Sequence, residues 1–280
     1  MEFNVPGGYV TYEDNTITGF GGKIECLSIP DEIRIEKIAK KAFFGAKNLG
    51  EVRLPESIQN IGEWAFASCT TLRRFYCDSK PDFAQGVFLN DENLSDIYIK
   101  DGENFSALLS AVCTQMEAEY LLNPQEAGSR EWYTKFDSRL FDILKEDDTV
   151  GYEKHVLCGE EDLLFDISVY VSQNRKRKAN LVYLRLIYND CLELDNRKKL
   201  EDYLKETYCG AENESGFLVL LDNAKDERYI RLYLDLGMLK DENFELTLSK
   251  LGQREATLKA ELIKHHDAVS SGGFFEDMLL

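Results

Sequence analysis

A short motif occurs three times in this chain at a nearly constant period. The two clearest copies are IAKKAFFGAKNL, from Ile38 to Leu49, and IGEWAFASCTTL, from Ile61 to Leu72; a looser copy, GVFLNDENL, runs from Gly86 to Leu94. The corresponding phenylalanines, 23 and 22 residues apart, are Phe43, Phe66 and Phe88. A fixed period of this length indicates a solenoid, in which each supersecondary unit buries its apolar side chains against the next.

Four short segments around these copies carry apolar residues two positions apart, which is the period of a strand with one buried face. They are Leu27–Ile29, Val52–Leu54, Phe75–Cys77 and Ile97–Ile99. We therefore predict that residues 27–99 form one right-handed coil with a four-stranded parallel sheet. The three phenylalanines should stack inside it, each carried by a short helix-like segment.

The chain from Tyr9 to Phe20 alternates β-forming residues around Asp14-Asn15, a pattern that predicts a β-hairpin. This hairpin should cover the first edge of the solenoid. Gly21-Gly22 follows, and we expect these glycines to serve a turn. The stretch from Gly19 to Lys23 lacks the spacing of a phosphate-binding loop.

The segment IPDEI, from Ile29 to Ile33, together with the later I-G-x-x-A-F-x-x-C-x-x-L motif from Ile61, resembles the BspA-like class of leucine-rich repeats. The resemblance covers about residues 9–100. It implies a repeat solenoid that acts as a recognition or adhesion surface, in a family found mainly in bacteria and lower eukaryotes. It brings over no catalytic residues. We expect residues 1–101 to form this domain, with the hairpin as its N-terminal cap.

From Asn104 onward the apolar residues take helical spacing. The first helix, from Asn104 to Leu122, should cap the open end of the coil. Residues 146–159 are charged and contain glycine, which indicates a loop, and a buried helix is predicted from Asp162 to Val171. The expected helical domain covers residues 102–267, so the whole chain is predicted to be α+β, a solenoid followed by an α-helical repeat domain.

A second repeat lies in the last third of the chain. The segment from Tyr183 to Leu204 aligns with that from Tyr229 to Leu251 at an offset of 46 residues. These segments resemble ankyrin-like helix pairs, without the Thr-Pro-Leu-His signature of ankyrin repeats. Residues 268–280 form a tail in which a flexible Gly-Ser joint precedes Phe274. The tail could fold onto the helices, dock on a partner or be disordered.

The composition restricts the class of partner. The net charge is −18, of which −14 falls after residue 100, and this argues against nucleic acid and anionic membranes. There is no apolar run long enough to cross a bilayer and no signal-peptide pattern at the start. The seven cysteines are scattered without a C-x-x-C pair. We therefore expect a cytoplasmic protein with free thiols.

Residues that could support other chemistry occur in three places. His265-His266-Asp267 is interpreted as a surface pair at a helix C-terminus, because adjacent helical side chains point about 100° apart and cannot easily chelate one ion. His155 lies near Cys158 without a recognisable third group. The basic run from Asn174 to Lys178 is interpreted as a solvated helix start. No catalytic residue, metal, cofactor or small-molecule substrate is predicted.

The pleat of the predicted strands defines a candidate binding surface. If Val52 and Leu54 face inward, the outward residues of neighbouring strands form two rows. One row is Ser28, Arg53, Tyr76 and Tyr98, and the other is Cys26, Glu51, Arg74 and Asp96. Tyrosine and arginine are enriched at binding hot spots, so we predict that another protein binds Arg53, Tyr76, Tyr98, Glu51, Arg74 and Asp96.

Three alternatives to this surface stay open. The same residues could simply stack as cross-strand pairs without binding anything. The chain could be an enzyme with its site in the cleft between the two domains, or a structural protein that takes part in assembly.

Overall fold

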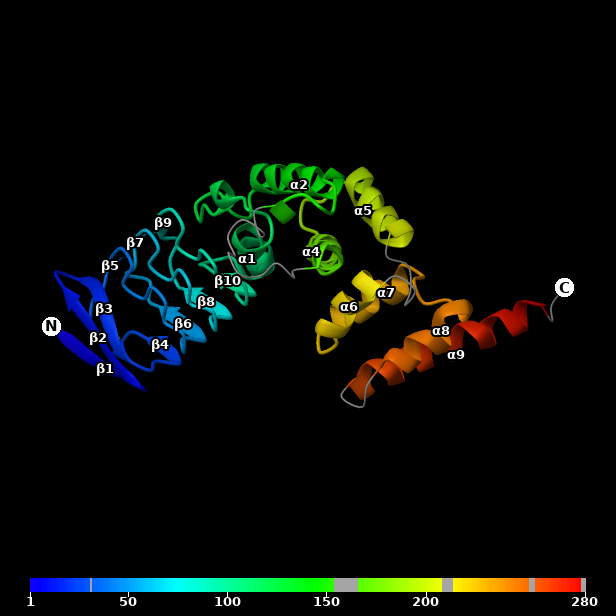
Figure 1. Ribbon diagram of the computed structural model, residues 1–280, viewed down its shortest axis with the longest axis horizontal. Coiled ribbons are helices and arrows are strands. Elements are labelled where there is room, and N and C mark those ends of the chain that lie inside the picture. Colours follow the sequence, from blue (N-terminus) through cyan, green and yellow to red (C-terminus); the bar gives the residue numbers. More distant parts are fainter. Residues whose placement is uncertain (31, 154–165, 208–213, 252–254, 278–280) are drawn as a thin grey trace. The chain divides into compact units, whose positions relative to one another are not determined.

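The computed structural model describes residues 1–280 except 31, 154–165, 208–213, 252–254 and 278–280 (Figure 1). The chain divides into two compact units, Met1–Phe141 and Asp142–Leu280. The first contains a solenoid of parallel strands and the second is helical, so the predicted α+β class is confirmed. The predicted domain border after residue 101 stays a prediction.

One sheet of the solenoid contains the four predicted strands in parallel. They are β4 (Cys26–Ser28), β6 (Glu51–Leu54), β8 (Arg74–Cys77) and β10 (Asp96–Tyr98). Leu27, Val52, Phe75 and Ile97 lie in one register and are fully buried. The two-residue period of the sequence therefore identified both the strands and their inward face.

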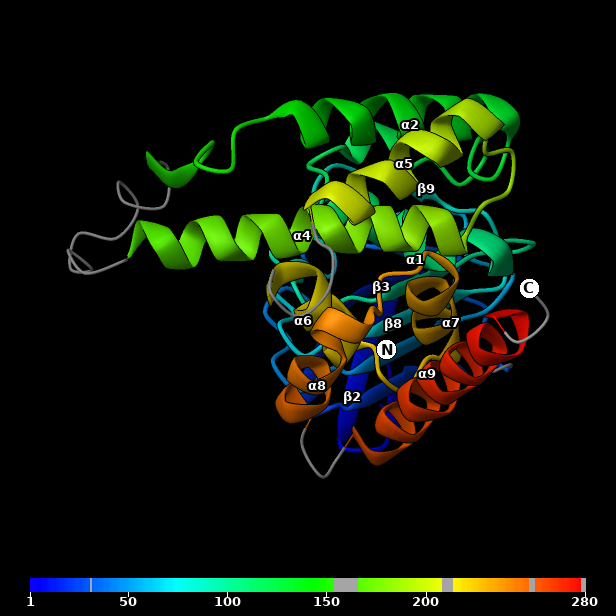
Figure 2. The ribbon, with the colours of Figure 1, turned by 90° about the vertical axis from the view of Figure 1, so that its right-hand side faces the viewer.

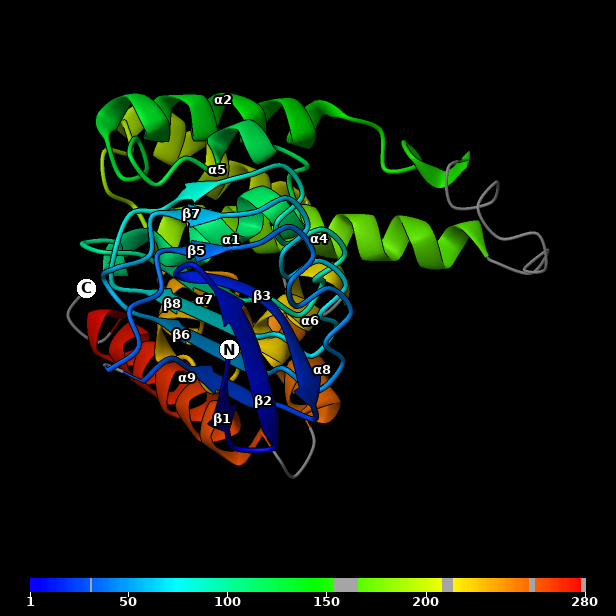
Figure 3. The same cartoon turned by 90° about the vertical axis from the view of Figure 1, so that its left-hand side faces the viewer.

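A second sheet combines the N-terminal hairpin with three very short strands (Figure 3). Its antiparallel strands are β1 (Glu2–Val5), β2 (Gly8–Glu13) and β3 (Thr16–Gly22), and its parallel strands are β5 (Lys37–Ile38), β7 (Asn60–Ile61) and β9 (Asp82–Phe83). The hairpin turn has positive φ at Asp14 and Asn15, 46° and 59°, which suits residues tolerant of the left-handed region. The predicted hairpin is confirmed, and β3 joins it to the solenoid through β5.

Gly21 and Gly22 lie inside β3, so the prediction that they serve a turn is wrong. A Cβ on Gly21 would lie 2.4 Å from the ring of Tyr9, and one on Gly22 would lie 2.4 Å from the carbonyl oxygen of Gly7. Gly22 needs glycine because it has a φ of 94° and meets backbone atoms of Gly7 and Gly8, whereas the Tyr9 ring packs over the bare backbone of Gly21.

The Ala-Phe segments are consecutive turns, not the helix-like segments that we predicted. The N–H of Phe43 donates to Ala65 in the next repeat (2.8 Å), while the N–H of Phe44 donates to Lys41 in its own repeat (3.1 Å). This alternation binds each turn both to itself and to its neighbour. The alternation requires a residue with positive φ at two positions of every repeat. The first position is held by Lys41, Trp64 and Gly86, and the second by Gly45, Ser68 and Asn90.

The predicted stack of phenylalanines fills the coil. The rings of Phe43 and Phe66 lie 5.2 Å apart and nearly parallel, and those of Phe66 and Phe88 lie 6.1 Å apart. Phe20 from the hairpin stacks on Phe43 at 5.5 Å and closes the first end of the column. Phe75 meets Phe66 edge to face, which is a favoured aromatic geometry.

The other end of the coil is covered by α1 (Ser106–Thr114), which packs against β10. Ser106 Oγ donates to Asp96 at 3.0 Å and Ser110 Oγ to the carbonyl of Leu94 at 2.6 Å. The expected single helix to Leu122 is wrong, because α1 ends at Thr114 and Gln115 and Glu117 then take non-helical φ angles of −127° and 47°. The neighbouring elements are η1 (Glu103–Phe105), η2 (Glu119–Leu121) and α2 (Arg130–Lys145).

Figures 1 and 2 show the described helices of the second unit, with α4 seen along its axis in Figure 1 and from the side in Figure 2. They are α4 (Ile167–Ile187), α5 (Leu194–Thr207), α6 (Glu214–Asp222), α7 (Glu227–Asp235), α8 (Asp241–Lys250) and α9 (Ala256–Asp277). α4 packs against α5, α6 and α7. Tyr183 and Tyr229, which the 46-residue offset aligns, stack with their ring centres 5.5 Å apart.

Two predictions about α4 are wrong. Ile167 and Val169 are each 46% exposed, so this end of the predicted Asp162–Val171 helix is not buried; residues 162–165 lie outside the described residues. The basic run lies in the middle of α4 and is not a solvated helix start. Lys178 is only 2% exposed because its ammonium binds Asp148 at 2.8 Å.

Two predictions about α9 are also wrong. The helix continues through residues 270–273, where we expected a flexible joint, and His265-His266 therefore lies in its interior and not at its C-terminus. His266 Nε2 lies 2.9 Å from Asp241 Oδ1, and its ring stacks on Phe244 at 3.7 Å. The imidazole thus joins α9 to α8.

Phe66→Ala should lower the free energy of unfolding of the first unit by about 3–5 kcal/mol, because it leaves a cavity in the middle of the ring column. Denaturant unfolding followed by tryptophan fluorescence measures this, since Trp64 and Trp132 both lie in the first unit. Phe44→Ala is the control, because that ring is 50% exposed and should contribute far less. Equal midpoints for the two variants would contradict the stack as the core.

Asp91 occupies an interior position of the third repeat and is 2% exposed. Its Oδ1 accepts from the N–H of Cys69 at 2.7 Å, whereas Oδ2 has no hydrogen-bond partner. Burial raises the pKa of this carboxyl to about 7, and the Cys69 N–H opposes the rise. Since an unfolded aspartate has a pKa near 4, the folded chain retains a proton between about pH 4 and pH 7 that the unfolded chain has released.

The free energy of unfolding should therefore fall as the pH rises from about 4 to about 7, by on the order of 2–4 kcal/mol from this group. Asp91→Asn should remove that component, so that the variant is more stable than the wild type at pH 8 and similar to it at pH 4. Urea unfolding at several pH values tests this. The exposed neighbour Glu92→Gln should keep the wild-type profile, and an unchanged profile in Asp91→Asn would refute the assignment.

Candidate protein-binding face

The outward face of the four-stranded sheet carries the two predicted rows in the predicted register. Arg53 pairs with Tyr76 and Tyr76 with Tyr98 across β6, β8 and β10, and Glu51, Arg74 and Asp96 pair in the same way one row away. Arg53 and Arg74 are exposed, and the other four are half-buried. We call these six residues the strand face: Arg53, Tyr76, Tyr98, Glu51, Arg74 and Asp96.

Three of these side chains form a continuous stack. The rings of Tyr76 and Tyr98 lie 4.6 Å apart and within 4° of parallel. The guanidinium of Arg53 lies 4.3 Å from the centre of the Tyr76 ring on the neighbouring strand. Adjacent strands are about 4.8 Å apart, so the sheet itself sets this stacking distance. The stack therefore follows from the strand register.

Arg53, which stacks on Tyr76, is also held by the row of charged residues. Glu51 accepts from Arg53 Nε at 2.7 Å and from Arg74 at 2.9 Å, so one carboxylate holds two guanidinium groups. The hydrogen bond that Arg53 donates to Glu51 raises the pKa of Arg53 above its ordinary value. Asp96 is held by the hydroxyls of Ser95 and Ser106, at 2.8 and 3.0 Å. Each of the six residues thus has a partner on or beside the face, Tyr98 through its ring stack.

A shallow depression lies at each end of the strands. The one at the N-terminal ends, of about 510 Å³, is lined by residues that include Lys47, Arg73 and Arg74. The one at the C-terminal ends, of about 650 Å³, is bounded by Tyr76 and Tyr98 and by the carboxylates of Glu56, Asp78, Asp101 and Glu103. Lys100 in this second depression is paired with Glu56 at 2.6 Å.

These end residues are absent from the two predicted rows, although the sequence contains a signal for them. Extending the two-residue alternation one step past each strand places Asp78 and Lys100 in a third row beside Tyr76 and Tyr98. This adds an acidic and a basic group at the C-terminal ends of the strands, beside the two tyrosines.

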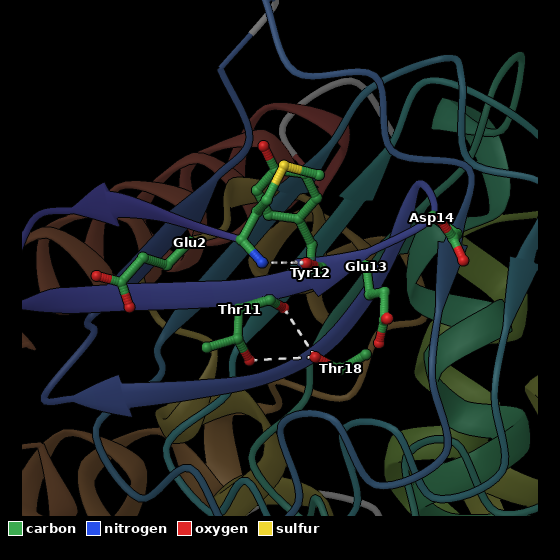
Figure 4. Close-up of a pocket in the computed structure, with 7 residues that line it drawn as sticks. Glu2, Thr11, Tyr12, Glu13, Asp14 and Thr18 are labelled. Atoms are coloured by element: carbon green, nitrogen blue, oxygen red, sulfur yellow. Dashed lines mark hydrogen bonds between the residues drawn. The ribbon is translucent and has the colours of Figure 1, made fainter.

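A third depression, of about 760 Å³, lies on the hairpin (Figure 4). Its walls include Glu2, Glu13 and Asp14, and the hydroxyls of Thr11 and Thr18 lie 3.2 Å apart across it. The ammonium group of Met1 donates to the Tyr12 carbonyl at 2.9 Å. These bonds connect neighbouring strands, so they explain how the hairpin is held together without a ligand.

Other chemical sites find little support. Within the described ranges, no group of three or more His, Cys, Asp or Glu side chains could hold a metal ion. His155, Cys158 and Glu160 lie outside the described residues. Among the helices that the structure describes, none has the length and apolarity to cross a membrane.

Residues 20–118 match the family model described as "BspA type Leucine rich repeat region", in six copies. No curated protein matches the chain. Among solved structures, a leucine rich repeat protein of T. pallidum is 25% identical, with a TM-score of 0.27, and covers 35% of this chain. The match spans 49% of that protein, so this chain corresponds to about half of its length.

Two further solved structures match the same share of this chain, 35%. One is a leucine rich cell surface protein of Faecalibacterium prausnitzii, at 22% identity, 31% of its own length and a TM-score of 0.29. The other is a leucine-rich repeat protein of Bacteroides capillosus, at 18% identity, 97% of its length and a TM-score of 0.25. Over residues 20–118 the chain is therefore similar to the BspA type of leucine-rich repeat region, and the parallel strand register and the stacked turns agree with a repeat solenoid there.

Proposed function

We propose that the strand face binds another protein. The observation that carries this proposal is the stack of Arg53 on Tyr76 on Tyr98, held in place before any partner arrives. Tyrosine and arginine dominate binding hot spots. A side chain that is already fixed by neighbours loses little conformational entropy on binding, so more of its contact energy appears as affinity.

The size of the face limits that affinity. Four strands span only on the order of 15 Å, since neighbours are about 4.8 Å apart. A standard interface buries roughly 800 Å² on each partner, which exceeds what so narrow a strip supplies. We therefore propose either a weak contact or one to which the end residues, such as Asp78 and Arg73, also contribute.

Leucine-rich repeat regions commonly act as protein-interaction modules, which favours a protein partner over nucleic acid or a small-molecule substrate. The face carries two arginines and two acids, so it has no net positive charge with which to attract phosphates. We propose recognition and not catalysis as its role. Two titratable groups converging on a bound small molecule would favour the enzyme alternative instead.

The proposal extends to two further points. Five cysteines in the described residues are free thiols, namely Cys26, Cys69, Cys77, Cys113 and Cys191, which supports a reducing compartment such as a bacterial cytoplasm. The stacked pair Tyr183 and Tyr229 supports helix pairs that repeat in the ankyrin-like manner across the second unit.

Replacing Tyr76 and Tyr98 together by serine should reduce capture of the partner from a lysate of the native host by about tenfold or more, because it removes both rings of the stack. The fold should survive, since both side chains lie on the outside of the sheet. Quantitative mass spectrometry of proteins retained by the wild type and by the variant measures this.

The matched control is Tyr120→Ser, which removes a tyrosine that is 67% exposed and lies on η2, away from the strands. It should retain the partner at the wild-type level. If the double variant recovers every partner as well as the wild type does, the strand face is scaffold and the proposed function is wrong.

A further inference from the structure

A second surface lies along the turns that carry the Ala-Phe segments, away from the strand face. Phe44 is 50% exposed and Leu89 is 47% exposed, although both are large apolar residues. Trp64 lies between their repeats and is half-buried, and Lys40 and Lys41 are exposed beside it. We call these five residues the turn-edge patch: Lys40, Lys41, Phe44, Trp64 and Leu89.

Measured distances show that the patch is continuous. The ammonium of Lys41 lies 5.4 Å from the centre of the Phe44 ring and 4.6 Å from that of Trp64. A Cβ built on Gly86 would lie 2.4 Å from Cδ1 of Trp64 and 3.8 Å from Cβ of Leu89. The indole therefore packs directly against the backbone of Gly86, and Leu89 lies on the same turn of the third repeat.

Trp64 holds this place at a conformational cost. Its φ is 56°, in the left-handed region, where a bulky side chain is rare. The equivalent residue of the next repeat is Gly86, which adopts a φ of 66° freely. Lys41 holds the same position in the preceding repeat at a φ of 60°, so the turn itself requires the conformation, but a side chain as large as an indole is strained there, and such strain is often found at functional sites. Glycine at position 64 would allow the same turn without strain, yet the residue there is tryptophan, which has the largest side chain of all.

The charges around the indole indicate what it could bind. Lys40 lies 4.8 Å from the Trp64 ring and is neutralised by Glu63 at 2.6 Å. Glu119, the other nearby acid, accepts from the backbone N–H of Gly86. Across the described residues, Lys41 has no carboxylate at ion-pairing distance. The patch thus offers one ammonium without a carboxylate partner, beside the exposed ring of Phe44 and the half-buried ring of Trp64.

We propose that the turn-edge patch binds a segment of a partner protein in which a carboxylate lies between bulky apolar side chains. The carboxylate pairs with Lys41, and the apolar side chains cover Phe44 and the exposed part of Trp64 and Leu89. Both parts are needed, because an exposed ion pair alone stabilises a complex very little. This site is separate from the strand face and from the function proposed for it.

The test uses three acetylated, amidated peptides added to the full ¹⁵N-labelled chain: Ser-Leu-Glu-Phe-Ser, the same peptide with Gln for Glu, and the same with Lys for Glu. The readout is the indole N–H resonance of Trp64 in ¹H–¹⁵N spectra. The chain has two tryptophans, and the buried Trp132, whose indole donates to the Leu121 carbonyl, is an internal reference. The Glu peptide should shift the Trp64 resonance saturably, the Gln peptide should bind about two- to five-fold more weakly, and the Lys peptide more weakly still.

Lys41→Gln should remove the preference for Glu over Gln, and the exposed Lys47→Gln, at the N-terminal depression of the strand face, should not. Trp64→Gly, which relieves the left-handed strain and so should fold, should abolish the shift of the Lys41 amide. Equal binding of the three peptides, no saturable shift at 5 mM peptide, or a larger response to oligothymidylate than to the Glu peptide would each overturn the proposal.

Discussion

The structure of the first unit depends on hydrogen bonds that each turn shares with the next. In the sheet the sharing is ordinary parallel pairing, but in the Ala-Phe segments every second N–H donates across to the following repeat, as Phe43 does to Ala65. The repeat length must therefore stay nearly constant, because one added residue would remove the acceptor. The same requirement aligns Phe43, Phe66 and Phe88, so backbone pairing and ring stacking select one register together.

That register acts outside the coil as well as inside it. Side chains at equivalent positions are brought about 4.8 Å apart, a distance suited to stacked rings and guanidinium groups. Where the repeated residues are Arg53, Tyr76 and Tyr98, the result is the strand face; where they are Lys41, Trp64 and Gly86, it is the turn-edge patch. The stacking geometry therefore fixes where the side chains of both surfaces lie, while the residue types at those positions determine what each surface can bind. The stacking geometry does not require tryptophan at the left-handed position of the second repeat, because glycine serves the same position in the third.

Periodic patterns made the strands, their register and the strand face predictable from residues alone. Strands β5, β7 and β9 could not be predicted in this way, because a strand of two residues is too short to show a two-residue period. The Ala-Phe segments have helical composition, yet bonds to the neighbouring repeat override local preference. Burial of Lys178 depends on Asp148, 30 residues away, which no local pattern reveals. The turn-edge patch was missed for a similar reason, since only the stacked turns place the Trp64 ring against Gly86 of the next repeat.

Polar hydrogen bonds mark the end of the repeat array, in addition to the weaker sequence motif of the third repeat. In the first turn the carbonyl of Leu49 accepts from Thr71 of the next repeat at 3.0 Å. The equivalent carbonyl of the last turn, Leu94, accepts from Ser110 of α1 at 2.6 Å, so the helix donates the bond that a further repeat would have supplied. Asp91 occupies the interior position that Ala46 and Cys69 hold in earlier turns, and there it accepts the Cys69 N–H. Burial of this carboxyl is unfavourable, as its raised pKa of about 7 shows, so the last turn accepts a stability penalty at neutral pH together with the hydrogen bond to Cys69.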